Sequence, residues 1–513
     1  MVMNGVVTVR VPGRLPGRRR WAALVVLVGS VLLLAIDGTV LYLAVPSLTR
    51  DLAPTATQIL WIGDVYSLAL AGLLVTAGTL ADRIGRKKVL LTGSAAFGVA
   101  SVLAAFSTSA EMLIGARLLL GVAGAAIMPS TLSIIRDLFP AARERTRAIA
   151  IWGAGSGGGL ALGPLVGGAL LDHIWWGSVF LVNVPVVAVF LVAGAVLLPE
   201  SRDPAPGRFD LLSAGLSVAA ITPLVYAMKH AVDRGIDAWT VLSVLVGLAA
   251  GVLFVLQQRR ARTPVIDVTL FRNPAFSGAV LANVIAIFAL TGLLFFFSQY
   301  LQLVRGFDPL QAGLAEMPMA IAMTLVIGVI GRTVARLGVG RAVAAGLLVA
   351  AIGLLLVAAA EDADHYLWLA LALLPIGLGV GLAMTLTVDA VVSAVPRHRA
   401  GAASAIAETA YELGVVLGIA VLGSVMALRY RTSLDVPDAA RPAVEESAAS
   451  ALAMLDPASD LARAVREAFI EAMQTTSVIA AVITAVAALV AWRTIPFGKK
   501  DDTVGTMSTP GGD

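Results

Sequence analysis

The sequence predicts an all-α polytopic membrane protein. Its 513 residues are 58% hydrophobic and only 14% charged, and the mean hydropathy is +0.90, whereas a soluble domain usually carries about 25% charged residues. The apolar residues gather in runs of about twenty, the length that one helix needs to cross the hydrocarbon core. A soluble fold could not hide this much apolar surface, so we expect a bundle of membrane-spanning helices.

Fourteen runs qualify as spans. The first follows a basic start that is similar to a signal peptide, but the run is long and no small-residue cleavage site follows, so we expect an uncleaved first helix. The predicted spans are 21–43, 59–80, 88–107, 111–136, 147–171, 177–198, 210–228, 240–257, 275–301, 310–331, 341–359, 365–393, 401–428 and 472–492.

Lysine and arginine predict the orientation, because they collect in short cytoplasmic loops. With the N-terminus inside, the inside segments hold most of them, including the run "RIGRKK" at 83–88, while the short outside loops hold only Arg50, Lys229, Arg234 and Arg305. We therefore expect both termini in the cytoplasm, an even number of spans and the long segment 429–471 outside. That segment, rich in Ala and mixed charge, is expected to form a short amphipathic helix pair or a flexible loop.

An internal repeat divides the chain. "GTLADRIGRKK" (78–88) follows the second span, and "GRTVARLGVGR" (331–341) follows the tenth with Gly, Arg and Gly at the same spacing. Duplicated halves around a central site are typical of transporters. The expected units are a cytoplasmic N-terminal tail (1–20), a six-helix half (21–198), a linker with two inserted helices (199–273), a second six-helix half (274–492) and a cytoplasmic C-terminal tail (493–513).

The stretch "AIDGTVLYLAVP" places Asp37 in an otherwise uncharged first span. A carboxylate in hydrocarbon is costly, so intramembrane acids tend to be functional. The other charges placed in or beside spans are Asp64, Arg117, Glu316, Asp389, Glu408 and Glu412. Each could instead be a misjudged boundary or a buried ion pair; this alternative is strongest for Asp389 and Glu316 and weakest for Asp37 and Glu408.

Glu408 and Glu412 are four residues apart and share one helix face. Two carboxylates that close repel each other, so at least one should hold a proton in a low dielectric. Arg117 could offset one acid, and a purely structural ion pair is its alternative role.

Glycines recur every four residues in the fifth span, at Gly155, Gly159, Gly163 and Gly167. They share one face and let another helix approach closely, while Pro164 should bend the helix. Tight packing alone is the simpler interpretation. The same region also satisfies the dinucleotide pattern GxGxxG, which we reject because it lies inside an apolar span.

The loop after the second span sets Asp82 among basic residues. It is either a solvated acid beside topogenic charges or a latch that caps a helix or pairs with an arginine in one of two states. The second repeat has Ala335 at that position, so such a latch would be asymmetric.

Several functions are disfavoured. The chain has no cysteine and four scattered histidines, and it lacks both GxxxxGK[ST] and HExxH. We therefore expect no ATP-driven pump, no enzyme, no metal and no cofactor, and the scattered basic residues argue against a nucleic-acid partner.

Several motifs together resemble the major facilitator superfamily. "GTLADRIGRKK" is similar to its signature loop, "GGGLALGPLVGGALL" (157–171) to its antiporter motif, and "IDGTVLYLAVP" (36–46) to the first span of its fourteen-span drug:proton antiporters. "WIGDVYSLALAG" (61–72) and "AETAYELGVVLGIAVLGS" (407–424) are similar to the QacA-like multidrug exporters. The resemblance implies a major facilitator fold with two six-helix halves plus two inserted helices, fourteen transmembrane helices in all.

The function implied by this resemblance is proton-coupled efflux of hydrophobic, preferably cationic, drugs or dyes across a bacterial cytoplasmic membrane by alternating access. The substrates, protons and the lipid bilayer are then the partners. The residues expected to couple protons to substrate are Asp37, Asp64, Arg117, Glu316, Glu408 and Glu412. Those expected to gate the movement are Gly78, Asp82, Arg83, Gly85, Arg86, Gly159, Gly163, Pro164 and Gly167. An exporter of an endogenous antibiotic, lipid or amino acid is the nearest alternative, and a membrane sensor without transport is a more distant one.

Overall fold

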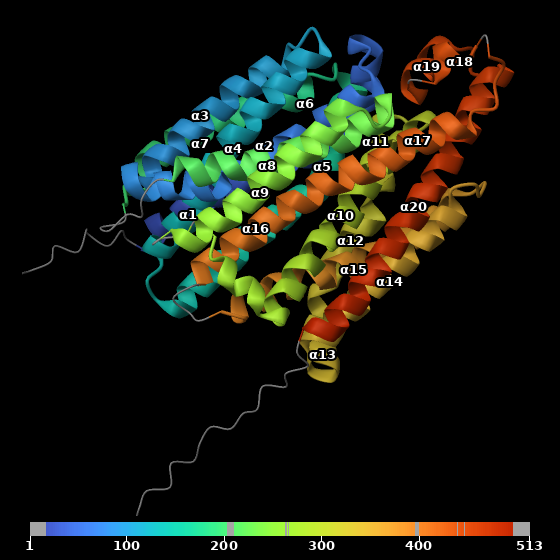
Figure 1. Cartoon of the computed structure of the whole chain (residues 1–513). Coiled ribbons are helices and arrows are strands. Elements are labelled where there is room, and N and C mark those ends of the chain that lie inside the picture. The colour runs from blue at the N-terminus through green and yellow to red at the C-terminus, as the bar shows by residue number, and fades with distance from the viewer. Residues whose placement is uncertain are drawn as a thin grey trace, which may run out of the picture.

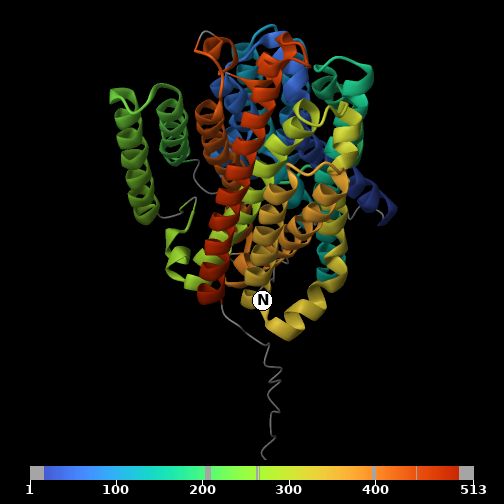
Figure 2. The ribbon, with the colours of Figure 1, turned by 90° about the vertical axis from the view of Figure 1, so that its right-hand side faces the viewer.

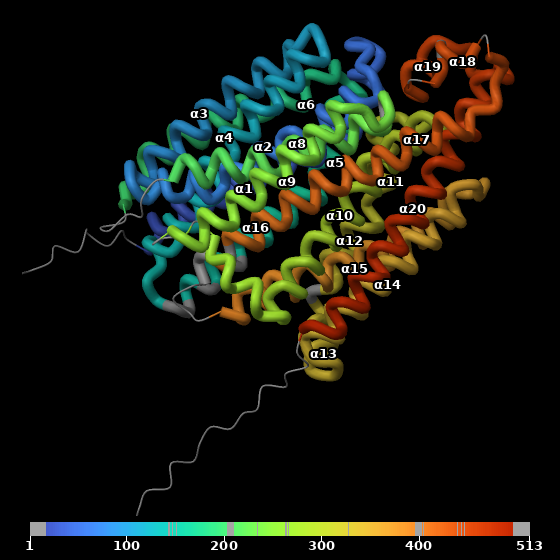
Figure 3. Tube along the Cα trace, in the orientation of Figure 1, coloured from blue at the N-terminus to red at the C-terminus, as the bar shows by residue number. Residues whose placement is uncertain are grey.

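The computed structural model describes residues 17–202, 210–261, 264, 266–395, 400–438, 440–445 and 447–495 (Figure 3). Across these residues the fold consists of helices joined by turns, with no strand. Most of both expected tails (1–16 and 496–513) and part of the expected linker (203–209) lie outside the described residues. The all-α prediction is confirmed.

Six spans precede the inserted pair. Their helices are α1 (Gly17–Leu52), α2 (Ala56–Ile84), α3 (Arg86–Ala105), α4 (Ala110–Leu138), α5 (Ala142–His173), α6 (Ser178–Leu181) and α7 (Asn183–Leu197). The short α6 and the longer α7 together form the sixth span, Ser178–Leu197. Thr55 begins α2 with a capping box, because its side chain accepts from the Gln58 amide while the Gln58 side chain accepts from the Thr55 amide.

The inserted pair is α8 (Leu211–Arg234) and α9 (Ala238–Arg260). It lies on one flank of the molecule, drawn in green at the left of Figure 2. α8 packs on α2, whereas α9 packs chiefly on α8 and exposes Leu245, Leu248 and Val252 on its outer side. An apolar side that remains exposed in the protein fits a lipid-facing helix.

The last six spans follow. Their elements are a 3₁₀ turn η1 (Val268–Arg272), α10 (Pro274–Leu303), α11 (Pro309–Ala315), α12 (Met317–Leu325), α13 (Ile327–Leu337), α14 (Val339–Ala360), α15 (Tyr366–Ser393), α16 (Ala400–Leu417), the π-helical turn η3 (Gly418–Leu422), α17 (Gly423–Ser433), α18 (Arg441–Val444), α19 (Ala448–Met454) and α20 (Asp460–Thr494). Figure 1 shows them as the yellow to red half of the bundle, beside the blue and teal first half.

Two of these spans are irregular. The tenth span is broken, since Pro309–Leu325 and Gly328–Leu337 meet at 55°. The thirteenth contains η3, where Gly418 packs against the backbone of Phe288 on α10. Among the described residues, thirteen helices are long and apolar enough to cross a membrane, and the bent pair makes a fourteenth span. The predicted number is confirmed.

The bundle has two ends, which we name the α19 end and the Arg86 end after the elements that lie there. The halves meet toward the α19 end: the Tyr42 and Phe295 rings are 5.5 Å apart, and Gln302 donates to the Leu43 carbonyl at 3.0 Å. These contacts indicate that the two halves are joined at the α19 end.

The structure differs from the sequence prediction at several boundaries. Helix α1 starts at Gly17, inside the expected tail 1–20. Helices α17 and α20 reach into the expected loop 429–471, which holds the short helices α18 and α19 between them. Lys229, expected in a short outside loop, is instead buried within α8. The predicted span 210–228 ends one residue before this lysine, because a charged ammonium lowers the hydropathy of the segment.

Candidate functional site

Asp37 lies at the centre of a buried polar cluster in the first half. Its Oδ2 accepts from Arg117 Nη1 of α4 at 3.2 Å, and its Oδ1 accepts from Asn183 Nδ2 of α7 at 2.7 Å. Asn183 Nδ2 also lies 3.2 Å from the Ser101 hydroxyl of α3. Both Asp37 and Arg117 are fully enclosed, at 0% and 1% exposed. Two other helices therefore hold the carboxylate directly, and a third contacts the Asn183 side chain that holds it.

Arg117 has further partners besides the carboxylate. Its Nε donates to the Ile62 carbonyl at 3.2 Å, and its guanidinium lies 4.7 Å from the centre of the Tyr66 ring. An arginine can keep these contacts when one anionic partner changes charge, because its guanidinium is planar and offers several donors. The geometry thus allows Asp37 to change charge without leaving Arg117 unpartnered.

A second buried pair joins α2 to the inserted helix α8. Lys229 Nζ lies 2.8 Å from Asp64 Oδ1 and 2.7 Å from its Oδ2. The same ammonium lies 3.9 Å from the centre of the Trp61 ring. Asp64 therefore has a cationic partner within the protein, which is the buried ion pair that the sequence left open as an alternative.

The acids of the second half have few partners. Glu412 is buried on α16 and interacts with Ser67 of α2, across the boundary between the halves. Glu408 lies one turn earlier and is partly buried. Glu316 sits at the break between α11 and α12, where its Oε1 is buried without a hydrogen-bond partner. Asp389, by contrast, is exposed near the end of α15.

The glycines of α5 face α1. A Cβ on Gly159 would lie 2.5 Å from Ala35 Cβ and 2.8 Å from the Leu32 carbonyl, and one on Gly163 would collide with Thr39. A Cβ on Gly167 would lie 2.7 Å from Val40. The Pro164 carbonyl touches Gly313 of α11 in the second half. This stretch of α5 therefore contacts both halves.

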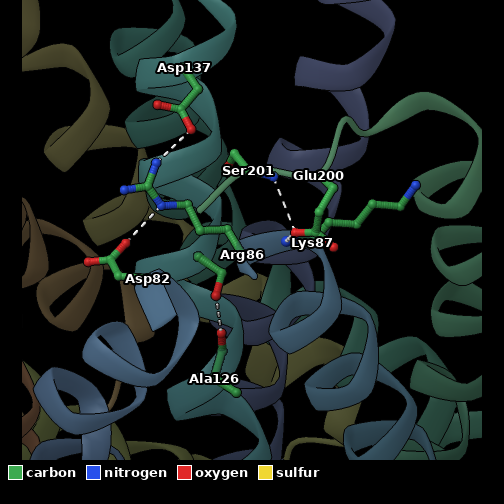
Figure 4. A network of polar contacts seen from close by, with 8 residues as sticks. Asp82, Arg86, Lys87, Ala126, Asp137, Glu200 and Ser201 are labelled. Atoms are coloured by element: carbon green, nitrogen blue, oxygen red, sulfur yellow. Dashed lines mark hydrogen bonds and ion pairs between the residues drawn. The ribbon is translucent and has the colours of Figure 1, made fainter. Parts of the chain in front are cut away.

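The residues around Arg86 form a charged cluster at the other end, shown in Figure 4. Arg86 Nε donates to Asp82 Oδ1 at 2.8 Å, and Arg86 Nη1 donates to Asp137 Oδ2 of α4 at 2.6 Å. Arg83 is exposed, and Gly78 packs near Pro129 of α4. Asp82 thus pairs with an arginine of its own loop, and that arginine ties the loop to α4.

Gly85 has a conformation and a neighbour that favour glycine. Its φ is 123°, a value that L side chains rarely adopt. An added Cβ would lie 2.6 Å from Glu200 Oε1, which accepts from the Lys87 and Ser201 amides. The matching Gly338 of the second repeat also has positive φ, 76°. The repeated glycine therefore makes the same sharp turn in both halves.

A separate apolar pocket lies at the α19 end. It is lined by side chains of α2, α10, α17 and α20, among them Leu60, Phe296, Met426, Tyr430 and Phe469. It does not include the buried acids of the spans, and the charged residues in its lining are Arg431 and Glu445. Within the described residues, no group of three His, Asp or Glu side chains could hold a metal ion.

Two residues of these buried clusters, Asn183 and Lys229, could not be identified from the sequence. Asn183 carries no charge and sits in an apolar span, although the "NVP" break between α6 and α7 marks it in hindsight. Hydropathy alone places a lysine at a span boundary, so the sequence predicts Lys229 in a loop. Pairing a buried acid with a basic residue near another span would have been the signal for it.

Buried charges inside a fourteen-span bundle with a repeated signature loop define the class: a polytopic membrane protein of the transporter type. The profile of the Major Facilitator Superfamily matches residues 27–419. The chain belongs to this superfamily.

Characterised relatives extend over most of the chain. "Multidrug efflux pump LfrA" of Mycolicibacterium smegmatis is 45% identical over 481 residues, covering 92% of this chain and 95% of that protein. "Methyl viologen resistance protein SmvA" of Salmonella typhimurium is 34% identical over 420 residues, covering 82% and 85%. "Tetracenomycin C resistance and export protein" of Streptomyces glaucescens is 34% identical over 416 residues, covering 80% and 77%.

The fold is also similar to that of solved transporters. A bacterial homologue of the human lysosomal transporter Spinster, in an inward-facing and unoccupied conformation, superposes with a TM-score of 0.67. The two chains are 18% identical, and the match covers 94% of this chain and 98% of that one. This likeness concerns the fold.

Proposed function

We propose that the chain is a multidrug exporter of the fourteen-span, QacA-like type, which exchanges hydrophobic and preferably cationic compounds for protons. The relatives named for multidrug efflux and methyl viologen resistance support the substrate class. One observation carries the proton coupling: Asp37 is fully buried in the first span and held by only two polar side chains. A carboxylate removed from water can hold either a proton or a cation.

The contacts of Asp37 suggest how a proton acts. A proton on the carboxylate removes the attraction for Arg117, whose contacts with the Ile62 carbonyl and the Tyr66 ring remain. Asp37 lies on α1 and Arg117 on α4, and Arg117 also contacts Ile62 and Tyr66 of α2. A change in the charge of Asp37 would therefore weaken the attachment of α1 to α4 and, through Arg117, to α2. The proton thereby biases one arrangement of the first half over another.

The setting follows from the Lys/Arg bias. The Arg86 end faces the cytoplasm of a bacterial cell, both termini lie inside, and the α19 end faces outside. The α19 end, where the halves are joined, is then the outer end. The Asp82–Arg86–Asp137 cluster lies at the cytoplasmic end and ties the loop to α4, which supports its assignment as a latch.

Purified protein in liposomes tests this function. A fluorescent lipophilic cation should move against its gradient when a pH gradient is imposed, and Asp37→Asn should reduce this flux to the level of protein-free vesicles, because an amide keeps the shape but takes up no proton. The matched control is Asp389→Asn, at an exposed acid near a helix end. Normal coupled flux in Asp37→Asn would show that Asp37 is structural.

An exporter of one endogenous compound remains the second candidate, and the tetracenomycin C exporter among the relatives favours it. The two functions differ in the range of compounds that the protein would transport. Competition by several chemically unrelated cations supports multidrug export, whereas flux that only one compound class inhibits supports the dedicated exporter.

A further inference from the structure

The surroundings of Asp64 have the composition of a binding site for an organic cation. A carboxylate supplies the charge, and the face of Trp61 supplies the aromatic surface on which such cations are commonly held. The ammonium of Lys229 occupies the position between them and is 1% exposed. The cation that fills the site in this structure is therefore part of the protein itself.

A purely structural role explains this arrangement poorly. A buried ion pair loses hydration that its mutual attraction only partly restores, and apolar residues often stabilise a core equally well. Helix α8 is already attached to its neighbours by other means. Leu68 of α2 packs with Val225 of α8 in an apolar cluster, and the Ser217 hydroxyl donates to the Gly72 carbonyl at 3.1 Å.

The position of Lys229 near the end of α8 would let its ammonium move away from Asp64. It lies five residues before the end of α8 at Arg234, which is about 7 Å along the axis. Its flexible four-carbon stem lets the ammonium reach the polar zone at that helix end, as lysines near span ends commonly do. Near the same end, Asp237 Oδ2 accepts from His230 Nε2 at 3.0 Å, so the zone already holds a carboxylate.

The Asp64–Lys229 pair also lies beside the second half. The cluster beside the pair includes Val416 and Ala420 of the thirteenth span as well as Leu68 and Val225 (α2 and α8 lie side by side in Figure 1). Arg117, which holds Asp37, also donates to the carbonyl of Ile62, two residues before Asp64 on α2. The two acids are therefore linked through one turn of α2.

We propose that Lys229 is a tethered competitor: its ammonium fills the Asp64–Trp61 site in the empty protein, and a lipophilic monovalent organic cation displaces it on binding. The inserted helix pair thereby takes part in substrate recognition. This inference rests on the proposed export of cations, and it adds a residue and a mechanism of selection to it.

Equilibrium binding of radiolabelled tetraphenylphosphonium to purified protein tests the competition. Lys229→Met should bind the probe about tenfold more tightly than the wild type, because the probe no longer displaces a charge-assisted hydrogen bond. Asp64→Asn combined with Lys229→Met should lose that gain. Ser217→Ala is the matched control, since it loosens α8 from α2 without changing charge, and it should bind as the wild type does.

The wild-type protein supplies an independent readout. Saturating tetraphenylphosphonium should increase the reaction of Lys229 with an amine-reactive reagent, mapped by mass spectrometry against Lys87 and Lys88 as references. Unchanged labelling of Lys229 with bound probe, or equal affinity in Lys229→Met and the wild type, overturns the competition but leaves cation export standing. Absence of binding in every variant overturns both proposals.

Discussion

At the scale of single residues, the buried acids differ in what surrounds them. Asp37 and Asp64 each form an ion pair with a basic side chain, whereas Glu316 and Glu361 each keep one buried carboxylate oxygen without a hydrogen bond and have no ion-pair partner among the described residues. A buried polar atom without a partner is costly. Asp37 and Asp64 are therefore held as ion pairs, whereas two acids of the second half are buried without a cationic partner among the described residues.

Glu361 provides a pH test outside the spans. It lies in the turn between α14 and α15, and burial raises its pKa from 4.5 to about 8, although a hydrogen bond from Ser477 opposes this. Between these two pH values the folded state holds a proton that the unfolded state releases, so stability falls as pH rises through the window. Glu361→Gln should therefore match the wild type in melting temperature below pH 4.5 and exceed it by several degrees at pH 8 and above.

Thermal unfolding in detergent across pH measures this difference. Asp362→Asn, at an exposed acid in the same turn, is the control and should follow the wild type throughout. A constant offset between Glu361→Gln and the wild type at all pH values would contradict the prediction.

Residues also mark the limits of sequence reasoning. Asp37 and Arg117 could be found because charge is conspicuous in an apolar run, and the fourteen spans follow from hydropathy. Asn183 could not be found, because a neutral amide changes hydropathy little, and Lys229 could not be placed, because its neutralising partner is 165 residues away in the sequence. Pairing across distant helices is a property of the packed bundle.

At the scale of elements, α5 shows most directly how packing limits substitution. Its glycines Gly159 and Gly163 touch α1, while Gly157 on the same helix has nothing within 4 Å of an added Cβ. Gly159→Leu or Gly163→Leu should push α1 and α5 apart and lower transport by on the order of tenfold or more, since overpacking a tight contact displaces backbone. Gly157→Leu, the matched control, should transport nearly normally.

Dye efflux normalised to the amount of inserted protein measures this effect. Equal activity of all three variants would mean that the approach of α1 to α5 is not required for movement. Loss in all three would indicate a general failure of α5.

At the scale of the whole molecule, the orientation is open to a direct test because the chain contains no cysteine. Ala458→Cys, exposed between α19 and α20, should react with a membrane-impermeant maleimide in intact cells. Lys88→Cys, exposed at the Arg86 end, should react only after permeabilisation. The reverse pattern would invert the proposed topology.

The inserted pair has a consequence for the surrounding lipid. Helix α9 has 23 residues, about 34 Å in length, while α1 has 36 residues, about 54 Å. The bundle can keep its length through contacts among its own helices, but α9 has chiefly α8 to support it. In a thinner bilayer, hydrophobic mismatch is relieved most easily by tilting the pair, and any tilt of α8 moves Lys229 relative to Asp64. The length of the lipid acyl chains should therefore alter cation affinity in the wild type but not in Lys229→Met. The thickness of the bilayer would then influence which cations the protein binds.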